Sequence, residues 1–314
     1  MSTDNTAILF PGQGSQQVNM GRDLAETDKE IMELWKKAES ISSLPLREIY
    51  WDGDAAAMAD TRNLQPALTV VNISLWMKMA GKISPVAAAG HSLGEYAAIA
   101  ASGALSAADT IELVSLRGRL MAEADPEGKG AMAAVLKLQL GDVEDVVRET
   151  ADATGEMILV ANYNTPGQFV LSGTKAAIDD AAARVKERKG RAMPLAVSGA
   201  FHSPMMKEAA AELASIMQKR QWNKMKFPVY CNVTGQAVSE GEALKNIMQG
   251  QMAGSVRWID TISNQWNAGV RQWIELGPKN ILGKMLTPIL AEAGAASDEW
   301  TTQTISTLEQ TEAL

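Results

Sequence analysis

Six consecutive residues, Gly90-His91-Ser92-Leu93-Gly94-Glu95, constrain the fold of this chain more than any other segment. They follow an apolar run over residues 85–89 and precede an alanine-rich run over residues 96–101. This order predicts a strand, a sharp turn and a helix, with Ser92 at the tip, in the G-x-S-x-G pattern of a nucleophile elbow. Glycine at both flanks removes side chains that would collide where the strand and the helix approach each other.

Such a turn would give Ser92 the surroundings of a nucleophile. Its hydroxyl is exposed above the strand end, and the next helix directs free N–H groups and partial positive charge toward an oxyanion that forms there. The alternative is a glycine-bounded turn that carries an ordinary serine. The strand before the motif and the helix after it favour the catalytic interpretation.

Length and charge limit the class of protein. The chain has 314 residues, of which 46% are hydrophobic and 21% charged, so it can bury a large core. This length suits one large domain or two unequal ones. The formal net charge is -8, which argues against broad binding to nucleic acid.

Cysteine usage and the N-terminal segment predict the compartment. Cys231 is the single cysteine, so no internal disulfide can form, as is usual in a reducing cytoplasm. It lies in the strand-like run 228–233, where a buried structural thiol is expected rather than a nucleophile. Residues 1–6 are polar and lack the character of a signal or transit peptide. No window is apolar for long enough to cross a bilayer, so we expect a cytoplasmic protein without a membrane anchor.

Strands separated by helices indicate a parallel sheet with helices on both faces. The first strand, 7–10, runs into the Gly-rich loop 11–16, and the elbow strand follows two long helical stretches. The tail after Ser297 is polar and is expected to be peripheral. Further helices are expected at about 27–40, 65–80, 107–123, 204–219, 260–268 and 278–291, and further strands at 229–233 and 272–277.

The segment 130–197 differs from the rest of the chain in the order of its predicted strands and helices. Its pattern predicts strands and helices in the order β-α-β-β-α-β, which is that of a ferredoxin-like unit. We interpret it as a small subdomain inserted into a larger α/β core formed by residues 1–129 and 198–314. The chain would re-enter the core just before His202.

A serine needs a base to take its proton, and the chain has only two histidines. His91 adjoins Ser92, and neighbouring side chains on so tight a turn point apart, so His91 is expected to pack beneath the elbow. His202 then remains as the base, on a loop at the predicted domain junction. The alternative is that His202 is an ordinary structural histidine.

Two kinds of group could orient the ring of His202. One is a carboxylate placed between the elbow and the histidine, as in Ser-His-acid hydrolases, and the other is a backbone carbonyl that accepts from the ring N–H. None of the acids in the intervening stretch stands out as a residue at a strand end. These acids include Asp109, Glu112, Asp125, Asp142 and Asp179.

Seven motifs in order carry a resemblance to a known family. They are Phe10-Pro11-Gly12-Gln13-Gly14-Ser15-Gln16, Gly90-His91-Ser92-Leu93-Gly94-Glu95-Tyr96, Arg117-Gly118, Gly130-Ala131-Met132, Asn162-Tyr163-Asn164-Thr165-Pro166-Gly167-Gln168, Phe201-His202-Ser203 and Glu275-Leu276-Gly277-Pro278. From about residue 7 to residue 290 the chain resembles the malonyl-CoA:acyl carrier protein transacylases of bacterial fatty-acid synthesis.

This resemblance implies a fold and a reaction. The fold would be an α/β-hydrolase-like large subdomain with the ferredoxin-like insertion. Ser92 would attack the thioester of malonyl-CoA with His202 as base, and the backbone N–H groups of Gln13 and Leu93 would hold the oxyanion. The malonyl group would then pass to the phosphopantetheine thiol of acyl carrier protein in a ping-pong transfer. Malonyl-CoA and the carrier protein are the expected partners, a monomer is expected, and no cofactor or metal is implied.

The resemblance also assigns three binding or positioning residues. Arg117 would grip the free malonyl carboxylate, for which a guanidinium is suited by its two parallel donors. The ring of Phe201 would fill the space that a methyl branch on the acyl group needs. The backbone carbonyl of Gln251 would accept from the catalytic histidine, although Ser255 stands where the family often has proline.

Other activities remain open on the same residues. A serine esterase or thioesterase would share the covalent intermediate and admit water, and a free-standing acyltransferase of a polyketide synthase would use another carrier protein. A protein that only binds an acyl-carrier partner would not need Ser92. The combination of Ser92, His202 and Arg117 favours acyl transfer.

Overall fold

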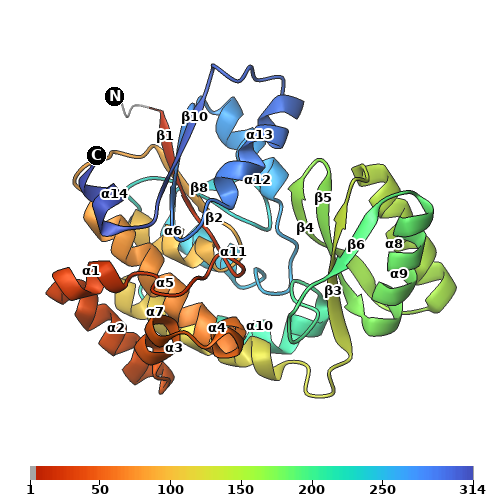
Figure 1. Ribbon diagram of the computed structural model, residues 1–314, viewed down its shortest axis with the longest axis horizontal. Coiled ribbons are helices and arrows are strands. Elements are labelled where there is room, and N and C mark those ends of the chain that lie inside the picture. The colour runs from red at the N-terminus through yellow and green to blue at the C-terminus, as the bar shows by residue number, and fades with distance from the viewer. Residues whose placement is uncertain (1–4, 314) are drawn as a thin grey trace.

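Two β-sheets organise the chain in the computed structural model, which describes residues 5–313 (Figure 1). The first sheet has six strands in the order β10-β9-β1-β2-β7-β8, and only β8 runs antiparallel to its neighbour. The predicted α/β class with a parallel sheet is therefore confirmed. The strands are β1 (Thr6–Phe10), β2 (Ala87–Gly90), β7 (Val229–Tyr230), β8 (Ala237–Val238), β9 (Gln272–Leu276) and β10 (Thr301–Ile305).

Side chains of the first sheet alternate between two cores. In β1, Ile8 and Phe10 enter the larger core, whereas Ala7 and Leu9 enter the smaller core on the opposite face. This alternation follows from the two-residue period of a strand, and burial on both faces explains why β1 is wholly apolar after Thr6. Residues of this sheet and its helices are called the large unit below.

Helices cover both faces of the first sheet. Helices α12 and α13 contribute to the smaller core, and α2, α5, α6 and α7 to the larger one (Figure 1). The helices of the large unit are α1 (Arg22–Thr27), α2 (Lys29–Ser42), α3 (Leu46–Asp52), α4 (Ala55–Ala59), α5 (Thr61–Met79), α6 (Gly94–Ser102), α7 (Ala107–Glu123), η1 (Pro204–Met206), α10 (Lys207–Met217), α11 (Gly241–Met248), α12 (Trp258–Asn267), α13 (Leu282–Glu292) and α14 (Leu308–Glu312).

The second sheet, with its two helices, is called the small unit. Its strand order is β4-β5-β3-β6, all neighbours are antiparallel, and its elements follow one another as β-α-β-β-α-β. The predicted domain boundaries stay a prediction, but every strand of this sheet lies between residues 130 and 194. The elements are β3 (Gly130–Leu136), α8 (Leu140–Thr154), β4 (Ile158–Thr165), β5 (Gln168–Thr174), α9 (Lys175–Glu187) and β6 (Arg191–Pro194).

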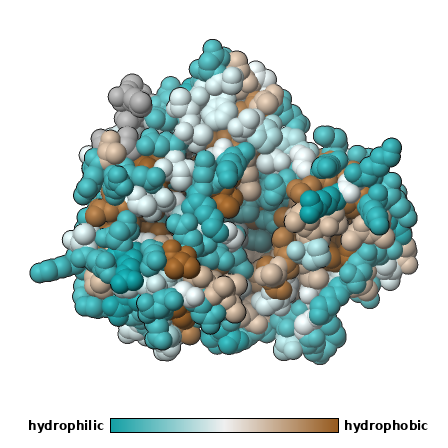
Figure 2. All heavy atoms as spheres, viewed as in Figure 1, coloured by the Kyte–Doolittle hydropathy of each residue, from teal (hydrophilic) through white to brown (hydrophobic). Residues whose placement is uncertain are grey.

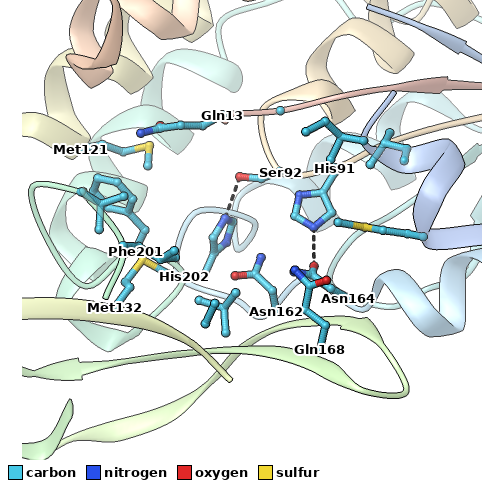
Figure 3. A pocket seen from close by; sticks show the side chains of 18 of the residues that line it. Gln13, His91, Ser92, Met121, Met132, Asn162, Asn164, Gln168, Phe201 and His202 are labelled. Atoms are coloured by element: carbon cyan, nitrogen blue, oxygen red, sulfur yellow. Dashed lines mark hydrogen bonds between the residues drawn. The ribbon is translucent and has the colours of Figure 1, made fainter. Parts of the chain in front are cut away.

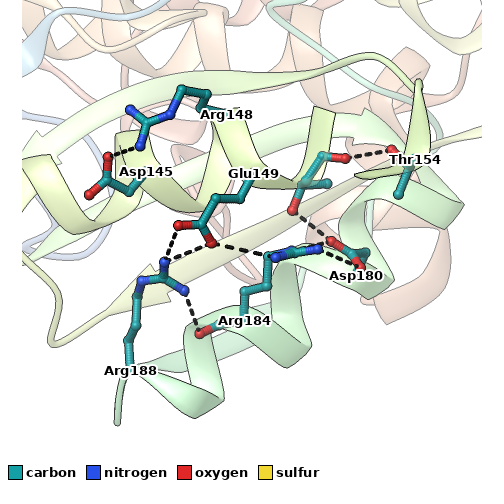
Figure 4. Close-up of polar contacts among 8 residues, drawn as sticks. Asp145, Arg148, Glu149, Thr154, Asp180, Arg184 and Arg188 are labelled. Carbon is teal, nitrogen blue, oxygen red and sulfur yellow. Dashed lines mark hydrogen bonds and ion pairs between the residues drawn. The ribbon is translucent and has the colours of Figure 1, made fainter. Parts of the chain in front are cut away.

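Helices α8 and α9 cover one face of the second sheet and are tied to each other by charged side chains (Figure 4). Glu149 of α8 accepts from Arg188 at 2.7 Å, and Thr150 of α8 donates to Asp180 of α9 at 2.9 Å. The opposite face carries Met132 and Val170, which pack into the core of the large unit. The small unit therefore presents a bare sheet face to the large unit.

Residues 249–257, called the bridging loop here, join the two units. Val256 pairs with β4, because its N–H donates to the Ala161 carbonyl at 2.8 Å and its carbonyl accepts from Tyr163 N–H at 2.9 Å. On the other side, Arg257 N–H donates to the carbonyl of Asn232 at 2.8 Å, just after β7. The loop is thus hydrogen-bonded to both sheets at once.

Several predicted element bounds were wrong. The strand expected at 229–233 ends at Tyr230, because the next residues leave the sheet and Cys231 N–H donates to the Gln236 carbonyl. The last long helix begins at Leu282 rather than at residue 278. The tail expected to be peripheral supplies β10, the edge strand, whose Ile305 is buried. The sequence did not predict this strand because its residues are polar. An edge strand can be polar, since little of its length is buried.

The structure tests the expected absence of a membrane-spanning segment for the described residues. Over residues 5–313, no helix is both long and apolar enough to cross a membrane. The polar N-terminal segment used to argue against a leader lies largely in residues 1–4, outside the described part of the chain.

The predicted elbow is present, and its two glycines make the close approach that was expected. A Cβ placed on Gly94 would lie 1.9 Å from the carbonyl oxygen of Phe10, and one on Gly90 would lie 2.0 Å from the carbonyl carbon of Gly94. These contacts are with backbone, which cannot rotate away as a side chain could. Strand β1, strand β2 and helix α6 therefore meet at a distance that only glycine permits.

We predict that Gly94→Ala lowers the free energy of unfolding by about 3 kcal/mol or more, because β1 must separate from α6. Gly141→Ala is the matched control, since a Cβ there meets nothing within 4 Å. In α8 that alanine should stabilise by up to about 1 kcal/mol. Urea unfolding of both variants gives the measurement, and equal effects would contradict the packing described for the elbow.

Candidate active site

The candidate site lies where the parallel strands end. Phe10 at the end of β1 is in register with Gly90 at the end of β2, and Ala89 of β2 is in register with Tyr230 at the end of β7. The loops that follow these strands therefore emerge side by side at the carboxyl edge of the sheet. In open α/β sheets this edge is the usual place for ligands.

Ser92 and His202 come together from two distant segments of the chain (Figure 3). The Ser92 Oγ lies 2.7 Å from the His202 Nε2, although 110 positions separate them in sequence. Both residues have left-handed backbone angles, with φ of 50° and 55°. Residues other than glycine rarely adopt this conformation, and such strain concentrates at functional sites.

The other ring nitrogen fixes the tautomer of His202. Its Nδ1 lies 2.9 Å from the carbonyl oxygen of Gly254 and 3.2 Å from that of Gln251, and a carbonyl can only accept. Nδ1 therefore carries the hydrogen, and Nε2 accepts from the Ser92 hydroxyl. Of the two orienting groups left open by the sequence, the structure has the backbone carbonyl. Within residues 5–313, no carboxylate is hydrogen-bonded to this ring.

Arg117 lies fully buried beside the nucleophile. Its Nη2 donates to the Ser92 Oγ at 3.2 Å and to the Gln251 Oε1 at 3.3 Å, while Nη1 donates to the Gln65 Oε1. The Ser92 oxygen thus accepts from a cation and donates to a neutral imidazole. This pair of contacts holds the hydroxyl in one orientation and favours negative charge on its oxygen.

The loop after β1 lies against the elbow, as the predicted oxyanion site requires. A Cβ on Gly12 would lie 2.3 Å from the His91 carbonyl oxygen and 3.5 Å from the Leu93 nitrogen. In the described part of the chain, neither Gln13 N–H nor Leu93 N–H has a hydrogen-bond acceptor. Two backbone donors beside Ser92 are therefore available to a developing oxyanion.

A cavity of about 240 Å³ opens in front of Ser92, between the two units (Figure 3). Figure 2 shows the molecular surface hollowed between these units, with hydrophilic residues over much of the surrounding face. The small unit contributes Met132, Ala134 and Val170 from its bare sheet face. Phe201 lines the cavity next to His202 and is 5% exposed, so its ring occupies space near the nucleophile.

His91 and Cys231 are not paired with Ser92. His91 Nε2 lies 2.7 Å from the Asn164 Oδ1, and its ring packs edge-on to Trp258. Instead of lying wholly beneath the elbow, His91 forms part of the cavity wall. Cys231 is buried and free, and burial raises the pKa of its thiol, so it is not poised to react as a thiolate.

Sequence reasoning missed part of the site. Asn232 accepts from Ser92 N–H at 2.7 Å, and the Gln251 side chain donates to the Ser92 carbonyl at 2.8 Å. Glu95 is fully buried behind them. A polar residue within two positions of the end of a parallel strand, as Asn232 is, could have been found by its position. Glu95 could have been found as the one acid of an apolar helix. No feature of the sequence indicated the role of Gly254.

Burial shifts the pKa of two titratable groups at the site, His202 and Glu95. Burial, together with the positive charge of Arg117, lowers the pKa of His202 to about 3, so the ring is neutral and able to accept a proton. Burial raises the pKa of Glu95 to about 7, although hydrogen bonds from Asn232 and Gln251 act in the opposite direction.

Comparison with known proteins shows extensive similarity. The family model for the acyl transferase domain matches residues 8–308. A malonyl CoA-acyl carrier protein transacylase of Haemophilus influenzae is 38% identical over 296 residues, covering 93% of this chain and 94% of that protein.

Solved structures agree over nearly the whole chain. The crystal structure of an acyl carrier protein S-malonyltransferase from Vibrio cholerae is 32% identical, with a TM-score of 0.90 and coverage of 99% of both chains. A malonyl-transacylase in complex with its type II polyketide synthase acyl-carrier protein is 31% identical, also with a TM-score of 0.90, covering 99% of this chain and 98% of that chain.

We predict a pH-dependent loss of stability that His202 causes. Its folded-state pKa lies below the ordinary value of 6.5, so the unfolded chain binds the proton first as the pH falls. The contribution of His202 to stability is therefore lost from about pH 6.5 downward, and it falls by about 1.4 kcal/mol between pH 7.5 and pH 5.5. The measurement is urea unfolding of the native protein and His202→Asn at both pH values.

The comparison between the two proteins isolates the histidine. Glu95 has a raised pKa and gains stability as the pH falls through 7, but it does so in both proteins. The change in the free energy of unfolding from pH 7.5 to pH 5.5 should therefore be about 1.4 kcal/mol less favourable in the native protein than in His202→Asn. An equal loss in the two proteins would contradict a buried, neutral His202.

Proposed function

The chain belongs to the acyl transferase family, together with the malonyl-CoA:acyl carrier protein transacylases, and from this we propose that it transfers malonyl groups from malonyl-CoA to acyl carrier protein. The product would supply fatty-acid synthesis. The observation that carries the proposal is the contact of the Ser92 Oγ with both the His202 Nε2 at 2.7 Å and the Arg117 Nη2 at 3.2 Å. The oxygen of the nucleophile thus contacts both its base and the cation that would bind the acyl carboxylate.

The first half-reaction would acylate Ser92. The hydroxyl proton passes to the His202 Nε2 while Oγ forms a bond to the thioester carbon of malonyl-CoA. The oxyanion of the tetrahedral intermediate accepts from Gln13 N–H and Leu93 N–H. Collapse of the intermediate breaks the carbon–sulfur bond, and the CoA sulfur leaves with the proton that His202 held.

The second half-reaction would reverse these steps with another thiol. The phosphopantetheine thiol of the carrier protein gives its proton to His202, and its sulfur bonds to the ester carbon of malonyl-Ser92. When the carbon–oxygen bond breaks, Ser92 recovers its proton from the imidazolium. The carbonyls of Gly254 and Gln251, both near Nδ1, stabilise the imidazolium in each half-reaction.

Two residues would select the acyl group. The Nε of Arg117 is buried and has no partner among the described residues, so this guanidinium has donor capacity left for a carboxylate. Binding of that carboxylate would favour malonyl over acetyl and would fix the direction of the acyl chain. The ring of Phe201 would exclude a methyl branch from the space beside His202.

The finer architectural and cellular assignments belong to the same proposal. The large unit would be α/β-hydrolase-like and the small unit a ferredoxin-like insertion, as the order β-α-β-β-α-β supports. The enzyme would act as a monomer in the cytoplasm and would need no cofactor or metal. A polyketide carrier protein is a second candidate acceptor, because one of the similar solved structures holds such a protein.

Product analysis tests the proposal. With malonyl-CoA and carrier protein, we predict that malonyl-carrier protein forms faster than free malonate, and that Ser92→Ala forms neither above background. Chromatography of both products gives the ratio. A serine hydrolase would release mainly malonate, and that result would reject transfer.

Arg117→Ala tests the selection of the acyl group in the same assay. The contact of Arg117 with the Ser92 Oγ serves both thioesters, so loss of the buried charged pair should appear in the ratio of kcat/KM for malonyl-CoA to that for acetyl-CoA, which should fall by about 100-fold. Arg119→Ala on the same helix is the matched control, because the Arg119 side chain is 52% exposed. An equal fall for both thioesters in Arg117→Ala would contradict a role in gripping the carboxylate.

A further inference from the structure

Glu95 is a buried carboxyl group for which the proposed reaction has no use. It lies in the first turn of α6, three residues after Ser92, and is fully buried. It is not among the residues that line the cavity, and its two oxygens face Asn232 and Gln251. A buried carboxylate is costly unless its oxygens accept hydrogen bonds, so the donors that face Glu95 are required for it to stay ionised there.

Each oxygen of Glu95 accepts from a different distant segment. Oε1 accepts from the backbone N–H of Asn232 at 3.0 Å, and Oε2 accepts from the side-chain Nε2 of Gln251 at 3.1 Å. The first donor follows β7, and the second lies in the bridging loop between the two units. One side chain thus joins the elbow helix to two loops that lie 137 and 156 positions away in sequence.

These two partners in turn hold the backbone of Ser92 from both sides. Asn232 accepts from Ser92 N–H at 2.7 Å and donates to the Gly90 carbonyl at 2.7 Å. Gln251 donates to the Ser92 carbonyl at 2.8 Å. Ser92, whose backbone is left-handed, therefore has its N–H and its carbonyl bound by Asn232 and Gln251. Both of these residues are in turn bound by Glu95.

Gln251 extends the same connections to the other reacting groups. Its carbonyl lies 3.2 Å from the His202 Nδ1, and its side-chain Oε1 accepts from Arg117. A change in the position of Gln251 therefore moves the base and the cation relative to the nucleophile. Displacements of about 1 Å in such an arrangement can lower a rate by about 100-fold.

We propose that Glu95 is a positioning residue for acyl transfer, which sets Ser92 against His202 by fixing Asn232 and Gln251 together. This inference rests on the proposed function, because it concerns the geometry of that reaction. It requires both carboxylate oxygens, since each serves one donor. An amide in the same place keeps one acceptor and turns an N–H donor toward the other partner.

Glu95→Gln in the full chain tests the inference. The measurement is single-turnover acylation of Ser92 over a range of malonyl-CoA concentrations, followed by intact-mass spectrometry. We expect the maximal rate to fall about 10- to 100-fold, while the malonyl-CoA concentration at half-maximal rate changes by less than about threefold. A residue that only supports folding would shift the thermal midpoint without lowering the rate per folded molecule.

Ile31→Val provides the control for stability alone. Ile31 is buried in α2 and contributes to the core without being part of the site. This variant should lower the thermal midpoint and leave the maximal acylation rate unchanged. A maximal rate for Glu95→Gln within about twofold of the native rate would overturn the inference.

Glu95→Asp decides the question if Glu95→Gln does not fold. The aspartate keeps the charge but is one methylene shorter, so it cannot reach both partners, and we expect a fall of about tenfold or more. A native rate in Glu95→Asp would overturn the inference. Failure of the native protein to acylate Ser92 would instead reject the proposed function, so the two failures are distinguishable.

Discussion

The left-handed backbone at Ser92 is the constraint on which the rest of the site depends. A serine with φ of 50° is strained, at a cost of about 1–2 kcal/mol, and it persists only where its surroundings over-determine it. Two glycines allow β1, β2 and α6 to close around it, and Asn232 and Gln251 bind its N–H and its carbonyl. This backbone conformation places the hydroxyl above the edge of the sheet, where the base can reach it.

The bridging loop makes the site a product of both units. Its residue Val256 pairs with β4 of the small unit, while Gln251 and Gly254 accept from His202 and Gln251 also contacts the elbow. The small unit therefore contributes to the site through this loop as well as through the sheet face that lines the cavity. Through this loop its position is linked to the geometry of the base, so movement between the units would alter the Ser92–His202 contact.

Local patterns predicted what local chemistry determines. The elbow and most helices could be predicted from short motifs, because a strand-turn-helix around Gly90 and Gly94 has few alternatives. The contact of His202 with Ser92 could be predicted from the count of histidines. Positions set by long-range pairing were not predictable in this way. The edge strand β10 is polar, Gly254 acts through its carbonyl alone, and the side-chain contacts of Gln251 depend on three segments that only the folded chain brings together.

Mass spectrometry of peptides from the malonyl-CoA-treated protein tests the central claim most directly. The claim is that Ser92 carries the acyl group because His202 removes its proton. The account predicts a malonyl ester on the peptide that contains Ser92, and its near absence in His202→Ala treated for the same time. Malonylation of another residue, such as Cys231, or an undiminished ester at Ser92 without the histidine, would contradict it.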